Sequence, residues 1–82
     1  MDTRVAAISI ILNERGSVEE LNSILHCYGE YIIGRMGLPY KPRNIYVISL
    51  VVDASADTIN SLAGRLGRLS GVSAKVTYAS EN

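Results

Sequence analysis

The segment from Arg4 to Leu12 reads RVAAISIIL, a run of β-branched and small apolar residues that is typical of a β-strand. Successive side chains of a strand point to opposite faces of its sheet. The two faces of this strand would carry Ala6, Ile8, Ile10 and Leu12 on one side, and Val5, Ala7, Ser9 and Ile11 on the other. Because both sets are largely apolar, the strand is expected to need cover on both faces.

A second two-faced strand is predicted from Ile45 to Val52, IYVISLVV. Its faces would carry Tyr46, Ile48, Leu50 and Val52 on one side, and Ile45, Val47, Ser49 and Val51 on the other. A weaker strand, Tyr31 to Leu38, precedes it and contains Gly34 and Gly37. Residues 39–44, which include two prolines, are expected to form a loop between them.

Two amphipathic helices are predicted between the strands. Ser17 would cap the first, with Glu20 completing a capping box, and Gly29 suits the left-handed position after its end. Its apolar stripe comprises Val18, Leu21, Ile24, Leu25 and Tyr28. Ser55 would cap the second helix. The stripe of this helix comprises Ile59, Leu62, Leu66 and Leu69, and Gly71 is expected to end it.

The last strand is predicted from Val72 to Tyr78, where apolar and polar residues alternate. The resulting order is βαββαβ, the split βαβ arrangement. We therefore expect residues 1–82 to form a single α+β domain, a ferredoxin-like (ACT-like) two-layer sandwich. Two helices would cover one face of a four-stranded antiparallel sheet, with the two apolar strands at its centre.

One layer of helices leaves the other sheet face uncovered. Covering several hundred Å² of apolar surface, at about 25 cal/mol per Å², is worth several kcal/mol, which rivals the whole stability of a small domain. We therefore expect a homo-oligomer, a dimer or tetramer. The expected interface residues are Val5, Ala7, Ser9, Ile11, Ile45, Val47, Ser49 and Val51. Gly64 and Gly67, inside the second helix, fit either close approach by a neighbouring chain or neutral drift.

Composition restricts the classes of partner and compartment. The 82 residues carry 8 basic and 8 acidic side chains, with no basic block, so no direct contact with nucleic acid is expected. The longest apolar run, Val5 to Leu12, is too short to span a membrane. Cys27 is the one cysteine, and no secretory leader precedes the first strand, which together favour a cytoplasmic location.

No catalytic or metal-binding constellation stands out in the sequence. His26 and Cys27 are adjacent on a helix, so their side chains point about 100° apart and do not chelate one metal easily. We interpret His26 as a solvated residue at the helix end and Cys27 as a semi-buried filler. The acidic residues fit capping and surface roles, so we expect no enzyme, no cofactor and no resident metal.

A small anionic effector has a candidate site after the first strand. Asn13, Gly16 and Ser17 lie in the turn that leads into the first helix, where free backbone amides attract anions. Arg35, in the weak second strand, is another possible anion contact. The alternative interpretation is an ordinary turn and an exposed edge-strand arginine.

The chain resembles, along nearly its whole length, the small proteins named as iron-only hydrogenase system regulators. The resemblance rests on residues 33–39 (IGRMGLP), 45–48 (IYVI), 57–59 (DTI) and 63–72 (AGRLGRLSGV). It implies an ACT-like fold and a regulatory role in hydrogenase systems. In ACT domains, amino acids bind at the turn after the first strand, a place that Asn13, Gly16 and Ser17 match only loosely.

More distantly, the chain resembles the C-terminal nickel-sensing domain of the NikR repressors, which are tetramers. The metal-ligand positions of that family fall on Gly37, Pro39 and Ile45, none of which can bind nickel. The resemblance therefore implies fold and assembly but neither nickel sensing nor DNA binding. We predict a non-enzymatic regulatory or ligand-sensing module that binds a small molecule or a partner protein. The alternatives are an accessory assembly protein without a ligand and a small enzyme with a site between subunits.

Overall fold

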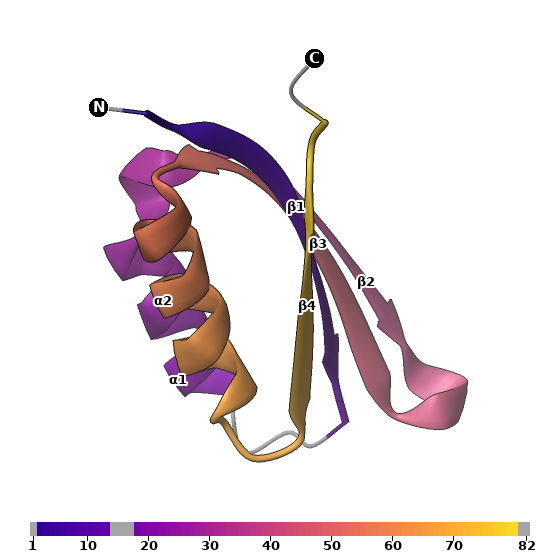
Figure 1. The fold of residues 1–82 in the computed structure, drawn as a ribbon. Helices are drawn as coiled ribbons and strands as arrows, with labels where there is room; N and C mark the ends of the chain where they lie inside the picture. Colours follow the sequence, from indigo (N-terminus) through magenta and orange to yellow (C-terminus); the bar gives the residue numbers. More distant parts are fainter. Residues whose placement is uncertain (1, 14–17, 81–82) are drawn as a thin grey trace.

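The computed structural model describes residues 2–13 and 18–80, and it has the βαββαβ order expected from the sequence. The sheet is antiparallel with strand order β2-β3-β1-β4, and both helices lie on one side of it (Figure 1). The central strands are β1 (Arg4–Leu12) and β3 (Ile45–Ala54), and the edge strands are β2 (Ile32–Tyr40) and β4 (Val72–Tyr78). The helices are α1 (Val18–Cys27) and α2 (Ala56–Gly67). The ferredoxin-like fold prediction is confirmed.

The core lies between the sheet and the helix layer. One face of each central strand is buried there, together with the apolar stripes of both helices. The fully buried side chains include Ile8, Ile10, Leu21, Ile48, Leu50, Ile59, Leu62 and Leu66. Each such side chain contributes about 1.5–3 kcal/mol relative to full exposure. These residues therefore fix which sheet face is turned toward the helices.

The N-terminus of α2 agrees with the sequence, but its C-terminus does not. Ser55 Oγ accepts a hydrogen bond from the backbone N–H of Thr58 at 3.1 Å, as expected of an N-cap. The prediction that the helix continues through Leu69 to Gly71 was wrong, because α2 ends at Gly67. Leu69 still packs against the core from the turn that follows. Gly71 has a φ of 74°, a conformation that glycine adopts readily, and its carbonyl accepts from the Asn13 N–H at 2.7 Å.

The hairpin between β2 and β3 is tighter than the sequence predicted. The expected loop 39–44 is wrong at its start, because β2 continues through Pro39 to Tyr40. An edge strand tolerates proline, since the missing N–H need not face a neighbouring strand. A 3₁₀ turn, η3 (Lys41–Arg43), and Asn44 with a φ of 54° connect the strands. Asparagine tolerates this left-handed conformation better than most residues.

The end of α1 also corrects two expectations. Gly29 does not have a positive φ; it begins a 3₁₀ turn, η2 (Gly29–Tyr31). Cys27 is exposed and not semi-buried, because at about 100° per residue it lies well off the stripe of Leu21 and Leu25. The capping box predicted at Ser17 lies outside the described residues.

The two glycines of α2 have room for a side chain within this chain. A Cβ on Gly67 would meet nothing within 4 Å, and one on Gly64 would lie 3.6 Å from the guanidinium of Arg68. Close packing inside the described chain therefore does not account for either glycine.

Candidate functional site

The sheet face opposite the helices carries most of the exposed large apolar side chains of the described residues. Val5 and Ile11 of β1 are 40% and 41% exposed, and Val51 of β3 is 37% exposed. Val47 and Ser49 lie on the same face and are half-buried by their neighbours. The expectation that both faces of the central strands are apolar is confirmed, since the other face forms the core.

The edge strand β2 contributes the most exposed apolar side chains to this surface. Met36, Leu38 and Tyr40 are 68%, 60% and 49% exposed. They pair with Ser49, Val47 and Ile45 and therefore share their face. We call the surface formed by Val5, Ala7, Ser9, Ile11, Met36, Leu38, Tyr40, Ile45, Val47, Ser49 and Val51 the open face. The β2 residues were absent from the predicted interface, although their alternation with Arg35, Gly37 and Pro39 is visible in the sequence.

The apolar character of the open face fades toward the opposite edge of the sheet. There, β4 presents Ser73, Lys75 and Thr77, all exposed, next to Ile11, Ser9 and Ala7 of β1. The predicted polar face of the last strand is thus confirmed. The apolar area is centred on β3 and β2 and not on the middle of the sheet.

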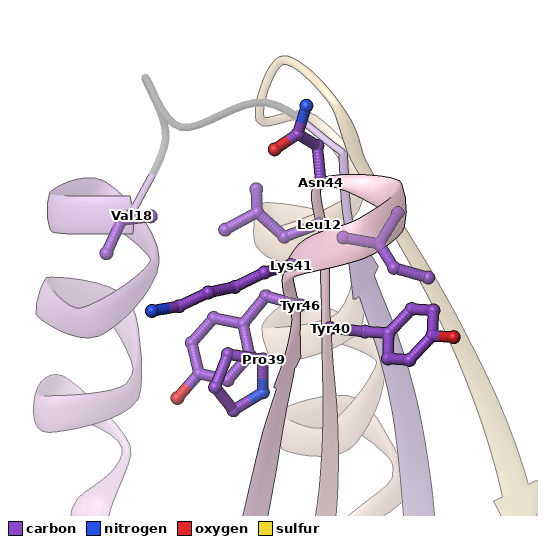
Figure 2. A pocket seen from close by; sticks show the side chains of 8 residues that line it. Leu12, Val18, Pro39, Tyr40, Lys41, Asn44 and Tyr46 are labelled. Carbon is purple, nitrogen blue, oxygen red and sulfur yellow. The ribbon is translucent and has the colours of Figure 1, made fainter.

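A cavity of about 380 Å³ lies on the helix side of the sheet, at the end where β2 turns into β3. Figure 2 shows Pro39 and Tyr46 on the strands and Val18 at the start of α1, on the two sides of the cavity. The cavity is lined by Leu12, Val18, Pro39, Tyr40, Lys41, Asn44, Ile45 and Tyr46. In the view of Figure 2, Lys41 extends toward α1, whereas the Tyr40 ring points to the other side of the sheet.

The position of Tyr46 in this cavity depends on a glycine in the neighbouring strand. Tyr46 pairs with Pro39, and its ring extends along β2 as far as Gly37. A Cβ on Gly37 would lie 2.8 Å from the Tyr46 hydroxyl oxygen, closer than such atoms approach in proteins. Gly37 therefore provides the space in which the hydroxyl end of the Tyr46 ring lies against the edge strand.

The residues suggested as anion contacts lie apart from one another. Arg35 pairs with Leu50, which pairs with Ile8, so Arg35 is level with the middle of β1. Asn13 follows the end of β1, five residues beyond Ile8, which is roughly 16 Å along the strand. Arg35 lies two strands away from β1, so its distance from Asn13 is larger still. The Arg35 guanidinium donates to the side-chain oxygen of Asn22 in α1 at 3.1 Å. Gly16 and Ser17 lie outside the described residues.

A second, more polar hollow of about 400 Å³ lies at the opposite end of the helix layer. The hydroxyl groups of Tyr28 and Ser61 are 3.1 Å apart, and the Arg65 guanidinium lies 5.6 Å from the centre of the Tyr28 ring. Hydrogen bonding to Ser61, and then to Arg65, lowers the pKa of the Tyr28 phenol. The same contact with Tyr28 raises the pKa of Arg65.

Metal-binding side chains do not gather in the described part of the chain. No group of three or more His, Cys, Asp or Glu residues that could hold an ion occurs within residues 2–13 and 18–80. His26 and Cys27 are both exposed near the end of α1. In the same residues, no helix is long and apolar enough to cross a bilayer.

Comparison with known proteins identifies a family and similar solved structures. The model of the TM1266-like family, described as "Iron-only hydrogenase system regulator, putative", matches residues 4–76. The structure of the uncharacterized protein TM1266 from Thermotoga maritima superposes with a TM-score of 0.93 and 31% identity, covering 96% of this chain and 100% of that chain.

A more distant match shows the fold alone. The structure of an unknown protein from Galdieria sulphuraria has a TM-score of 0.67 and 15% identity, covering 99% of this chain and 48% of that chain. A search among curated proteins finds no match.

Proposed function

The chain belongs to the TM1266-like family, whose description is that of a regulator of an iron-only hydrogenase system, and we propose that it is a homo-oligomeric, ligand-sensing regulatory module. In this proposal, copies of the chain cover one another's open faces. A small molecule shifts the balance between two arrangements by binding one of them more tightly, as any such effector must. The module has no catalytic role of its own.

The observation that carries the proposal is the exposed apolar area of the open face. The large side chains of Ile11, Met36 and Leu38 lie on it, and no charged residue separates them along β2 and β3. Monomeric proteins rarely expose a continuous apolar patch larger than a few hundred Å². Removing such an area from water contributes several kcal/mol at about 25 cal/mol per Å². Self-association is the simplest source of that cover.

The assembly is tested by sedimentation velocity of the full chain at micromolar concentration. The proposal expects a dimer or a larger closed oligomer whose population falls on dilution. A monomer across the micromolar range would contradict it. Fluorescence of the apolar dye ANS tests the assembly independently. The dye binds weakly if another subunit covers the open face and more strongly if that face is in contact with water.

Sensing is tested separately from assembly. A ligand that binds the folded state raises the melting temperature as its concentration exceeds its dissociation constant. A thermal-shift series with amino acids, other small carboxylates and metal ions is expected to contain a stabilising compound. An assembled protein that no compound stabilises would favour the accessory role, in which assembly itself is the function.

A further inference from the structure

We propose that the cavity between α1 and the β2–β3 hairpin binds a small molecule with an apolar body and a single carboxylate. This inference deepens the proposed function, on whose sensing role it rests, by naming a site and a class of ligand. The site differs from the turn that the sequence suggested, although Leu12 and Val18 flank that turn on its two sides.

The size and lining of the cavity indicate the apolar body. Its volume of about 380 Å³ lies at the small end of the range for ligand pockets in proteins. Leu12, Val18 and Pro39 provide aliphatic surface, and the Tyr46 ring provides an aromatic one. A ring or a branched aliphatic group would be removed from water on several sides at once, which favours binding.

The polar groups of the cavity indicate the carboxylate. Lys41 extends across the Tyr46 ring toward α1, and the Tyr46 hydroxyl points to the same side (Figure 2). Neither Glu19 nor Glu20 of the first turn of α1 lines the cavity. No carboxylate of the described residues forms an ion pair with Lys41. The ammonium group is thus available to a ligand, and the hydroxyl can donate a second hydrogen bond.

A single ammonium group beside apolar walls suits a carboxylate better than a phosphate. Arginine forks and several donors commonly surround phosphate groups, because these carry more charge and more acceptor oxygens. Here one cation offsets one negative charge, and the amide of Asn44 is a further polar group among the lining residues. Lys41 is exposed in this chain, so its ammonium group would attract a carboxylate bound in the cavity and would add little to the binding of a neutral ligand of the same shape.

The test uses 3-phenylpropionate as the probe, with 3-phenylpropionamide and propionate as matched compounds. Binding to the full-length protein is measured by calorimetry and located by ¹H–¹⁵N NMR. We expect 3-phenylpropionate to shift the amide signals of Leu12, Val18 and Lys41. The amide lacks the charge and propionate lacks the ring, so each is expected to bind about tenfold more weakly or worse.

Substitutions in η3 then test whether the charge of Lys41, and not a change in the fold, accounts for binding of the probe. Lys41→Met keeps the length of the side chain and is expected to weaken 3-phenylpropionate about tenfold while leaving the amide unchanged. Arg43→Met is the matched control, since Arg43 is exposed in the same turn and does not line the cavity. NMR spectra of both variants verify that the fold is intact.

Three outcomes would overturn the inference. These are unchanged affinity in the Lys41→Met variant, signal changes centred on Tyr28 and Arg65 instead, or no binding of the probe at millimolar concentration. Sedimentation of the same samples keeps the two ideas apart. If the protein assembles but does not bind the probe, the ligand class proposed here is wrong and the proposed assembly still stands.

Discussion

The Tyr46 ring lies so close to Gly37 that a Cβ on the glycine would stand 2.8 Å from the Tyr46 hydroxyl oxygen and 3.1 Å from the nearest ring carbon. The contact joins the central strand β3 to the edge strand β2 on the helix side of the sheet. The glycine leaves room for the ring beside β2, where Tyr46 lines the cavity together with Val18 and Lys41.

Replacing Gly37 with alanine is expected to move the Tyr46 ring and to lower stability by on the order of 1 kcal/mol, the usual scale of overpacking. Gly34→Ala is the control in the same strand, because its Cβ would meet Val51 at an ordinary 4.0 Å. That variant should be neutral or slightly stabilising, since alanine loses less backbone entropy than glycine. Urea unfolding and the NMR signals of the Tyr46 ring check both variants; equal stabilities would refute the steric argument.

A charge on the open face is expected to disrupt the proposed assembly. Leu38 is 60% exposed in the single chain, so Leu38→Asp should cost little in the fold of one subunit. In a covered interface it would bury an unpaired carboxylate, which costs several kcal/mol. Sedimentation velocity should show a shift toward monomer. Thr77→Asp, on the polar strand β4, is the control and should leave the distribution of oligomers unchanged. If both variants behaved alike, β2 would not be part of the interface.

The arrangement of the sheet could be predicted because the deciding signals are local and repeated. Two-residue alternation in the segments that form β1 and β3 showed that both faces are apolar. Only a central position in the sheet suits such strands. The Ser55 cap was equally visible, since the hydroxyl acts on an amide three residues away.

The cavity could not be predicted, because it depends on contacts between segments far apart in the chain. Pro39 predicted a loop, whereas the sheet edge accommodates it and extends β2 to Tyr40. That extension brings Pro39 beside Tyr46 and carries Lys41 over the ring. The end of α2 was misjudged for a related reason, since Leu69 reaches the core from a turn as well as it would from a helix.

Removal of the α2 cap is expected to destabilise the fold without affecting the cavity. Ser55→Ala leaves the Thr58 N–H without its acceptor, at a cost of about 1 kcal/mol. Ser55→Asp supplies a carboxylate oxygen in its place and should retain most of the stability. Urea unfolding measures both. If alanine and aspartate were equally tolerated, the hydrogen bond from Thr58 would contribute nothing to stability.

The Tyr28 phenol is expected to lose its proton below the ordinary range for tyrosine. Its pKa is lowered first by the hydrogen bond with Ser61 and then by Arg65. A lowered pKa in the folded state favours the phenolate, so any added stability is present only at alkaline pH, above the unfolded pKa, and is lost as pH falls through the folded value. At neutral pH the effect on folding is therefore absent.

NMR titration of the Tyr28 ring should show the pKa rising in Ser61→Ala and in Arg65→Met. Asn60→Ala, next to Ser61 on α2 but hydrogen-bonded to Tyr78, should leave the pKa of Tyr28 in place. A titration of Tyr28 that neither Ser61→Ala nor Arg65→Met changes would show that these contacts do not stabilise its phenolate.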